Sequence, residues 1–304
     1  MSSSPPEGFT ARPLEPVDAP AAAALLLTYD EAHLGEVIDR LSEQDVLDWW
    51  GFYDLERESM ALHGPTALAA FGLMNVRADD VLELDGYVHP ERCGLGLGSF
   101  LLEWAEESAH GASRRLRVAT VPADPASAPL VEGRGYRPVR HFYRMVADLP
   151  EPPPTAEWPP GFEVSMLQEG EERLLYEAIE EAFAEEWGRP PRSFEDWQQT
   201  VFAQEAFDPS LCFLVRRKDE VAAAEMCSRR FGMGFVNSIG VRKPWRRRGL
   251  GRALLLHGFS KLYERGERRI GLGVDAENPT GATRLYESAG MRVAWQATVY
   301  EEPS

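Results

Sequence analysis

The sequence predicts an α/β protein of two similar domains, each a mixed, mostly antiparallel sheet flanked by helices. The first observation is a repeat. Gly8-Phe9 returns as Gly161-Phe162, and the segment 88–102 returns as 241–255, both at a spacing of 153 residues. A constant spacing over this distance indicates duplication of a whole domain. Each copy then has about 150 residues, a common size for a domain with one hydrophobic core.

The second observation is a proline-rich segment between the copies. Residues 149–160 hold six prolines, too many to continue a strand or a helix, and they predict a stiff, extended linker. We therefore expect a first domain over 1–148, the linker over 149–160, and a second domain over 161–304.

The third observation is the order of strand and helix patterns in the second copy. Residues 162–167 predict a strand, and the apolar spacing of 171–186 predicts a helix. The elements expected after these are a helix over 197–202, strands over 211–215 and 221–227 around a Lys218-Asp219 turn, a strand over 235–241, a loop and helix, a strand over 270–274, a helix around Tyr286 and a strand over 293–300. Periodicity alone does not fix the order of the strands in the sheet.

Composition limits the possible functions. Hydrophobic residues make up 44% of the chain, but no apolar run reaches the length of about 20 residues that a membrane helix needs. The net charge of −17 disfavours nucleic acid as a partner, because phosphates would be repelled. The amino terminus lacks a basic signal-peptide region, and the three cysteines lack metal-ligand spacing. These features predict a cytoplasmic protein without a metal site.

The most informative segment is 241–256, where an apolar strand leads into a helix through arginines and glycines. Gly249 and Gly251 have no side chain to obstruct an anion, so amides at the helix N-terminus can point at a diphosphate. A Walker loop requires Gly-Lys-Ser/Thr, and a dinucleotide-binding fold requires G-x-G-x-x-G. Neither pattern is present, because Arg252-Ala253 follows Gly251.

The arrangement V-x-x-P-x-R-x-x-G-x-G-x-x-L-L resembles the acyl-CoA loop of the GNAT family of N-acetyltransferases. The resemblance implies acetyl-CoA as cosubstrate. The residues expected to bind it in the strand, the loop and the last helix are Ile239, Gly240, Val241, Arg246, Arg247, Arg248, Gly249, Leu250, Gly251, Arg252 and Asn278. The alternative for the loop is an ordinary basic helix cap.

A second segment, 278–291, resembles the last helix of the same family. By that resemblance Asn278 meets the pantetheine arm, and Tyr286 lies beside the thioester sulfur as general acid. The alternative for Tyr286 is a half-buried helix tyrosine. Phenol and thiol pKa values differ by about two units, so this proton transfer is not strongly uphill.

The general base is less well defined, because the strand 235–241 has no carboxylate where many family members carry a glutamate. Glu225 interrupts the apolar run 221–227 and is the best replacement. A charge inside a strand is costly unless it faces water or a polar site. Glu225 therefore either faces the cleft as catalytic base or lies on the wet side of an edge strand.

The first copy departs from the pattern at the residues that carry chemistry. Cys93 and Leu95 replace Arg246 and Arg248, Asp124 replaces Asn278, and Val131 replaces Tyr286. A valine cannot donate a proton. Chemistry is therefore assigned to the second copy, as in two-domain GNAT proteins, and the first is expected to be a scaffold rather than a passive coenzyme site.

The sequence thus predicts an N-acetyltransferase that transfers acetyl from acetyl-CoA to the amine of a small molecule. Five glutamates between 177 and 186 favour a cationic amine, although such a run is also typical of a solvated helix face. The alternatives are a non-catalytic acyl-CoA sensor and, less favoured by the charge, a peptidyltransferase that uses aminoacyl-tRNA.

Overall fold

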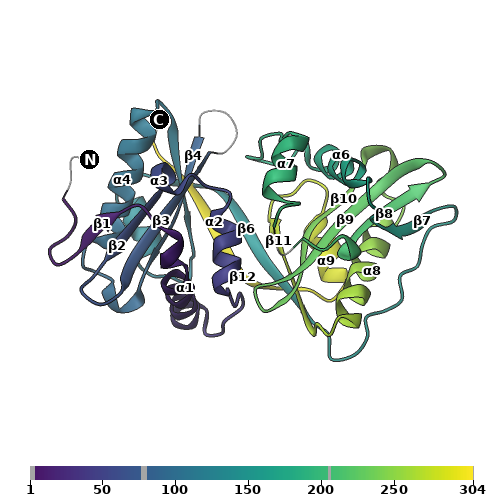
Figure 1. The fold of residues 1–304 in the computed structure, drawn as a ribbon, viewed down its shortest axis with the longest axis horizontal. Helices are drawn as coiled ribbons and strands as arrows, with labels where there is room; N and C mark the ends of the chain where they lie inside the picture. Colours follow the sequence, from purple (N-terminus) through teal and green to yellow (C-terminus); the bar gives the residue numbers. More distant parts are fainter. Residues whose placement is uncertain (1–3, 77–80, 205–206, 304) are drawn as a thin grey trace. The chain divides into compact units, whose positions relative to one another are not determined.

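The computed structural model describes residues 4–76, 81–204 and 207–303. The chain forms two compact units (Figure 1). Unit 1 contains residues 1–142 and 295–304, and unit 2 contains residues 143–294. These units differ from the expected domains in two segments, because 143–148 lies with unit 2 and 295–304 lies with unit 1.

Unit 1 begins with β1 (Thr10–Arg12), the 3-10 turn η1 (Pro16–Asp18), and helices α1 (Ala19–Leu34), α2 (Glu43–Trp50) and α3 (Leu55–Glu58). There follow β2 (Ser59–His63), β3 (Leu68–Val76), β4 (Val81–Val88), η2 (Pro90–Arg92), α4 (Leu97–Gly111), β5 (Arg115–Thr120) and α5 (Ser127–Glu132). The strand order is β1-β2-β3-β4-β5-β12. Only the β4–β5 pair is parallel among the pairings recorded for these strands.

Unit 2 contains β7 (Glu163–Met166), α6 (Glu172–Phe183), α7 (Phe194–Thr200), η3 (Pro209–Leu211), β8 (Cys212–Arg217), β9 (Glu220–Arg230) and β10 (Met233–Val241). The 3-10 turn η4 (Lys243–Trp245), α8 (Leu250–Glu264), β11 (Arg269–Asp275) and α9 (Ala282–Ser288) follow. The strand order is β7-β8-β9-β10-β11-β6, and β10 and β11 are parallel. The expected mixed sheet flanked by helices is confirmed.

Two long strands account for the difference from the expected domain boundaries. β6 (Arg137–Asp148) has 12 residues and β12 (Arg292–Glu301) has 10, about twice the usual strand length. The end of β6 joins unit 2, where Met145 lies in the core and Leu149 donates to Arg268 O at 2.7 Å. The end of β12 pairs with β5 of unit 1, with Val299 opposite Ala119. Each sequence copy therefore supplies its last strand segment to the other unit.

The repeat is preserved in strand register. Thr10 pairs with His63 in unit 1, and Glu163 pairs with Arg216 in unit 2. Both partners are displaced by the 153 residues that separate the sequence copies. This register lets each position of one unit be compared with its counterpart in the other.

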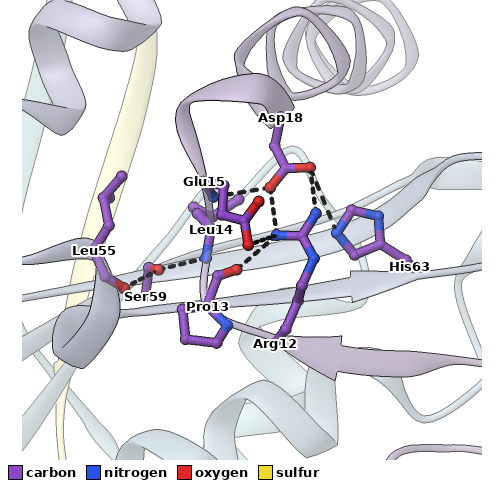
Figure 2. A network of polar contacts seen from close by, with 8 residues as sticks. All are labelled: Arg12, Pro13, Leu14, Glu15, Asp18, Leu55, Ser59 and His63. Atoms are coloured by element: carbon purple, nitrogen blue, oxygen red, sulfur yellow. Dashed lines mark hydrogen bonds and ion pairs between the residues drawn. The ribbon is translucent and has the colours of Figure 1, made fainter.

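A polar network fixes the first strand of unit 1 to the helix that follows it (Figure 2). Arg12 donates to both carboxylate oxygens of Asp18 at 2.7 and 2.8 Å, and the backbone N–H of Glu15 donates to Asp18 at 2.9 Å. Burial alone would raise the pKa of Asp18, but these donors outweigh it and the pKa is lowered. In unit 2, Glu171 takes the place of Asp18 and accepts from Gln168 N and Arg216 at 3.0 and 2.7 Å.

Apolar clusters lie on both faces of the unit 2 sheet. Alternate residues of β9 contact α8 on one face and α6 on the other, so Cys227 belongs to one cluster and Ala224 to the other. Neither face of this sheet is left to solvent, which explains why β9 reads as an apolar run. Within the described ranges, no helix is long and apolar enough to span a bilayer.

Candidate functional site

The arginine-rich loop of unit 2 lies between η4 and α8. Gly249 caps α8 with φ 85°, and Arg247 also has a positive φ of 59°. The left-handed turn at these positions is easiest for glycine, and it turns the chain so that helical amides face outward at the N-terminus of α8. Pro159 of the linker lies 3.9 Å from where a Cβ on Gly249 would be. The predicted strand–loop–helix geometry is present.

Two further glycines are required by close packing. A Cβ on Gly251 would lie 3.2 Å from Leu285, so this glycine lets α9 approach the start of α8. A Cβ on Gly240 would lie 2.5 Å from the Cβ of Ala182, so this glycine lets α6 lie directly on the end of β10. Both glycines bring helices to the same end of β10.

A β-bulge separates the two ends of β10. Pairing with β9 shifts register between Val236 and Ser238, and Ser228 Oγ donates to Oδ1 of the bulged residue, Asn237, at 2.8 Å. In the register recorded for the described chain, parallel pairing with β11 covers Gly234 and Phe235 only. In the pairing recorded for the described strands, the register with β11 does not extend to Ile239, Gly240 and Val241. The sequence did not predict the bulge, which has no signal in residue type.

The cations in the loop and on the elements next to it fall into two groups. The first is tied to α6: Arg242 lies 2.6 Å from Glu181, and Lys243 lies 2.7 Å from Glu185. The second group has no carboxylate partner in the described part of the chain and consists of Arg217, Arg247, Arg248 and Arg252.

Arg246 has a structural position that the sequence did not reveal. Its guanidinium donates to Val241 O at 3.0 Å and to Ala182 O at 3.1 Å, and it lies 3.9 Å from Glu185. It therefore ties the end of β10 to α6, in addition to the charge it brings to the loop.

Asn278 and Tyr286 lie on the segment after β11. Asn278 Oδ1 accepts from Thr280 N at 2.9 Å and so fixes the turn before α9. Tyr286 on α9 is only 7% exposed, and its pKa is raised by burial and, to a lesser extent, by Glu225 and Glu186. The phenol is therefore neutral and keeps its proton at neutral pH.

Glu225 does not lie where the sequence placed it. β9 is a central strand, and the Glu225 side chain is 0% exposed. Its carboxylate lies under α8, where a Cβ on Gly258 would be 2.6 Å from Oε2. Neither oxygen has a hydrogen-bond partner among the described residues, and burial raises the pKa well above its usual value. Glu225 thus faces neither an open cleft nor solvent, because the register of β9 directs it into the core.

The glutamates of 177–186 are largely engaged within the protein. Glu180 accepts from Arg189 at 2.6 Å and from Trp197 at 3.0 Å, and Glu181 and Glu185 form ion pairs with Arg242 and Lys243 as described. Glu186 is different, because its charge acts on the Tyr286 phenol while it lies 3.6 Å from Arg189. Glu186 is the acidic residue of this run that is electrostatically coupled to Tyr286, and sequence reasoning did not single it out.

Unit 1 retains the glycine positions of this site without its arginines and tyrosine. Gly96 caps α4 with φ 81°, and a Cβ on Gly98 would lie 3.2 Å from Leu130, as Gly251 does from Leu285. The recorded β4–β5 pairing runs to Asp85 and Ala119 with no register shift in the described strands.

The ends of β4 and β5 in unit 1 enclose a cavity of about 340 Å³ with the start of α4. Its lining includes Cys93 and Val131, which are the substitutions for Arg246 and Tyr286, and Asp124, which accepts from Tyr29 Oη at 3.1 Å. The retained glycines were the signal for this cavity. In the part of the chain that is described, no cluster of His, Cys, Asp or Glu is placed to hold a metal ion.

Known proteins resemble both the sequence and the fold. A model of the Acetyltransferase (GNAT) family matches residues 173–291. The mycothiol acetyltransferase of Thermobispora bispora is 33% identical over 214 residues, covering 67% of this chain and 70% of that protein. That of Kineococcus radiotolerans is 28% identical over 295 residues and covers 94% of each chain.

Solved structures extend the similarity over the whole chain. A GCN5-related N-acetyltransferase from Sphaerobacter thermophilus has a TM-score of 0.83 and 36% identity, covering 98% of this chain and 96% of that one. A tandem GNAT protein from the clavulanic acid biosynthesis pathway has a TM-score of 0.69 at 16% identity, covering 97% and 99%, and shares the fold. The tandem GNAT architecture predicted from the repeat is confirmed, and the relatives named above are mycothiol acetyltransferases.

Proposed function

Because the chain belongs to the GNAT acetyltransferase family, we propose that its second unit transfers the acetyl group of acetyl-CoA to the amine of a small molecule. The observation that carries this assignment to unit 2 is the bulge at Asn237 in β10, together with the buried Tyr286 on α9. The bulge opens the strand edge on which a thioester can lie, and unit 1 has Val131 at the place of the tyrosine.

The coenzyme fits the residues around α8. The amides at Gly249, Leu250 and Gly251 would hold the diphosphate, and the α8 dipole favours its charge. Arg247, Arg248 and Arg252 would balance that charge, while Arg246 shapes the loop. Bound acetyl-CoA supplies an activated thioester, and the β11 side of residues 239–241 would orient and polarise its carbonyl. The amide of Asn278 would contact the pantetheine arm.

Tyr286 would donate the proton that the departing thiolate needs. Burial keeps this phenol protonated, so the O–H is available whenever the acceptor attacks. The same burial makes the phenol a weaker acid, so donation depends on contact with the sulfur.

We assign no base role to Glu225 in this arrangement, because a fully buried carboxylic acid under α8 cannot reach an amine. The amine would attack in its neutral form, and the proton that its nitrogen loses on forming the amide would pass to water. The same exchange with water would restore the proton that Tyr286 gives to the thiolate. Activity should then rise with pH as the amine deprotonates. The names of the relatives make a mycothiol-related amine the first acceptor to test.

Unit 1 would support unit 2 without chemistry of its own, since Val131 cannot donate a proton and Cys93 and Leu95 remove two cations. A non-catalytic sensor remains the second function, favoured by the missing strand carboxylate. It predicts coenzyme binding with no acetyl transfer to any amine.

The Tyr286→Phe variant tests the proposal. We expect thiol release with an amine panel to fall by about 100-fold, the size of a general-acid contribution, while acetyl-CoA affinity changes less than about twofold. Tyr263→Phe, a change of the same kind on α8, is the matched control and should keep full activity. Unchanged turnover in Tyr286→Phe removes this residue from the reaction, and absence of thiol release with every amine in the unmodified protein favours the sensor.

A further inference from the structure

The cations that α6 does not neutralise gather beside the coenzyme loop. Arg247, Arg248 and Arg252 lie on or just after the loop, and Arg217 ends β8 at the neighbouring hairpin. All four are exposed. On a chain of net charge −17, four adjacent cations without carboxylate partners in the described ranges form a local site for a polyanion.

An aromatic ring lies within this group. The guanidinium carbons of Arg217 and Arg248 lie 5.6 and 5.5 Å from the centroid of the Trp245 ring. Phe162 meets the same ring edge-on at 5.6 Å and also lies 5.6 Å below Arg217. We call these four residues, Phe162, Arg217, Trp245 and Arg248, the Trp245 shelf. The half-buried Trp245 thus has two exposed guanidiniums close to its ring.

The shelf is not a requirement of the fold, since unit 1 lacks it. Phe9 is retained in the place of Phe162, and it lies 3.4 Å from a Cβ built on Gly64. Gly64 holds the place of Arg217 in the shared register. Arg92 and Leu95 hold the places of Trp245 and Arg248. The same loop therefore forms without the tryptophan and its flanking arginines, so packing alone does not explain them in unit 2.

We propose that the Trp245 shelf binds the nucleotide end of the coenzyme, with the adenine ring against Trp245 and the ribose 3′-phosphate on Arg217. This rests on the proposed function of unit 2. The 3′-phosphate is a separate group of up to two negative charges, and a guanidinium fork matches its oxygens. An indole ring stacks on a purine base through its flat face. The α8 amides remain for the diphosphate.

Dephospho-CoA, which lacks only the 3′-phosphate, gives a direct test. Titration calorimetry of the full chain at fixed ionic strength would compare its affinity with that of CoA. We expect the unmodified protein to bind CoA about tenfold more tightly. Arg217→Gln should bring that ratio to about one, through weaker binding of CoA alone. Lys218→Gln changes the same charge one residue away and should leave the ratio intact, which separates contact from the general field.

Trp245→Leu tests the adenine contact. We expect it to weaken both ligands by a similar factor of about ten, leaving their ratio unchanged. Circular dichroism and thermal unfolding of each variant confirm that it is folded.

Each result decides the matter. An unmodified protein that does not distinguish CoA from dephospho-CoA, or equal losses in Arg217→Gln and Lys218→Gln, overturns the 3′-phosphate contact. Unaltered binding by Trp245→Leu overturns the adenine contact. If neither ligand binds, the proposed function of unit 2 fails as well, which is distinct from binding without discrimination.

Discussion

The close contact between Glu225 and Gly258 can be compared with the equivalent position in unit 1. In unit 1, Gly72 pairs with Met60 as Glu225 pairs with Phe213 in unit 2, so the two positions are equivalent. A Cβ on Gly72 would lie 3.1 Å from Leu84 and 3.5 Å from Trp104. Apolar side chains thus fill in unit 1 the space that a carboxylic acid fills in unit 2.

The raised pKa of Glu225 predicts a pH-dependent stability. The carboxyl is neutral in the folded chain and ionises in the unfolded chain above its ordinary pKa of 4.5. The contribution of the neutral carboxyl to the free energy of unfolding is therefore fully present below pH 4.5. It falls by about 1.4 kcal/mol per pH unit as the pH rises towards the pKa of Glu225 in the folded chain. The side chain at position 225 of the Glu225→Gln variant is neutral at every pH. The free energy of unfolding of the variant, relative to that of the original protein, should therefore increase from pH 5 to pH 8.

Urea unfolding at several pH values measures this difference. Glu264→Gln removes one exposed charge on the same helix as Gly258 and serves as the control. A difference between Glu225→Gln and the original protein that does not change with pH would show that Glu225 is charged in the fold.

At the scale of elements, α6 packs directly against the end of β10. Gly240 lies against Ala182, and Arg246 bonds to the carbonyl of the same alanine. The helix that borders the site and the strand that carries it are thereby fixed together. The position of α6 relative to β10 therefore depends on Gly240 and Arg246, which the sequence indicated only as coenzyme-binding residues.

Gly240→Ala should destabilise the protein by about 1–3 kcal/mol, since its Cβ would lie 2.5 Å from that of Ala182. The double variant Gly240→Ala/Ala182→Gly should recover most of the loss, because it moves one methyl group across the contact. Denaturant unfolding of the four proteins gives the coupling energy. Gly111→Ala, where nothing lies within 4 Å, is the control. Additive effects would mean that the helix shifts and the contact is not tight.

The sequence predicted nearly every element of unit 2, because strand and helix periods and the glycines of the loop are local signals. It could not predict the bulge at Asn237, which depends on how β10 pairs with β9. Nor could it predict the direction of Glu225, which depends on the register of β9 in the sheet. The same limit applies to Arg246, whose acceptors Val241 and Ala182 are set by the packing of α6. The expected domain boundaries differ from the compact units for a similar reason: the proline-rich linker marks where the copies join, not where their sheets end.

At the scale of the whole molecule, strand exchange makes each unit depend on both copies. Unit 1 needs the end of β12 for its sheet, and unit 2 needs the end of β6 for its core. Neither the segment 1–148 nor the segment 161–304 contains a complete sheet.

Val299→Pro should therefore disrupt unit 1, although residue 299 belongs to the second sequence copy. Proline cannot donate a backbone N–H and fits poorly inside a paired strand, so it should weaken the pairing of Thr298, Val299 and Tyr300 with β5. Hydrogen exchange should report faster exchange in β5 and β4, while amides of β9 and β10 stay protected. Met145→Pro is the reciprocal variant and should expose the strands of unit 2. If Val299→Pro lost amide protection only in unit 2, the assignment of the end of β12 to unit 1 would be wrong.

The exchanged strands also bear on how such a protein can evolve. After a gene duplication, a copy without activity is usually free to be deleted, but here deletion of either copy would leave the survivor with an open sheet edge prone to aggregation. With the chemistry in the second copy, as proposed, selection for folding alone would retain the first copy while positions such as Val131 drift. A gene split at the linker would have to yield two polypeptides that assemble, each closing the other's sheet.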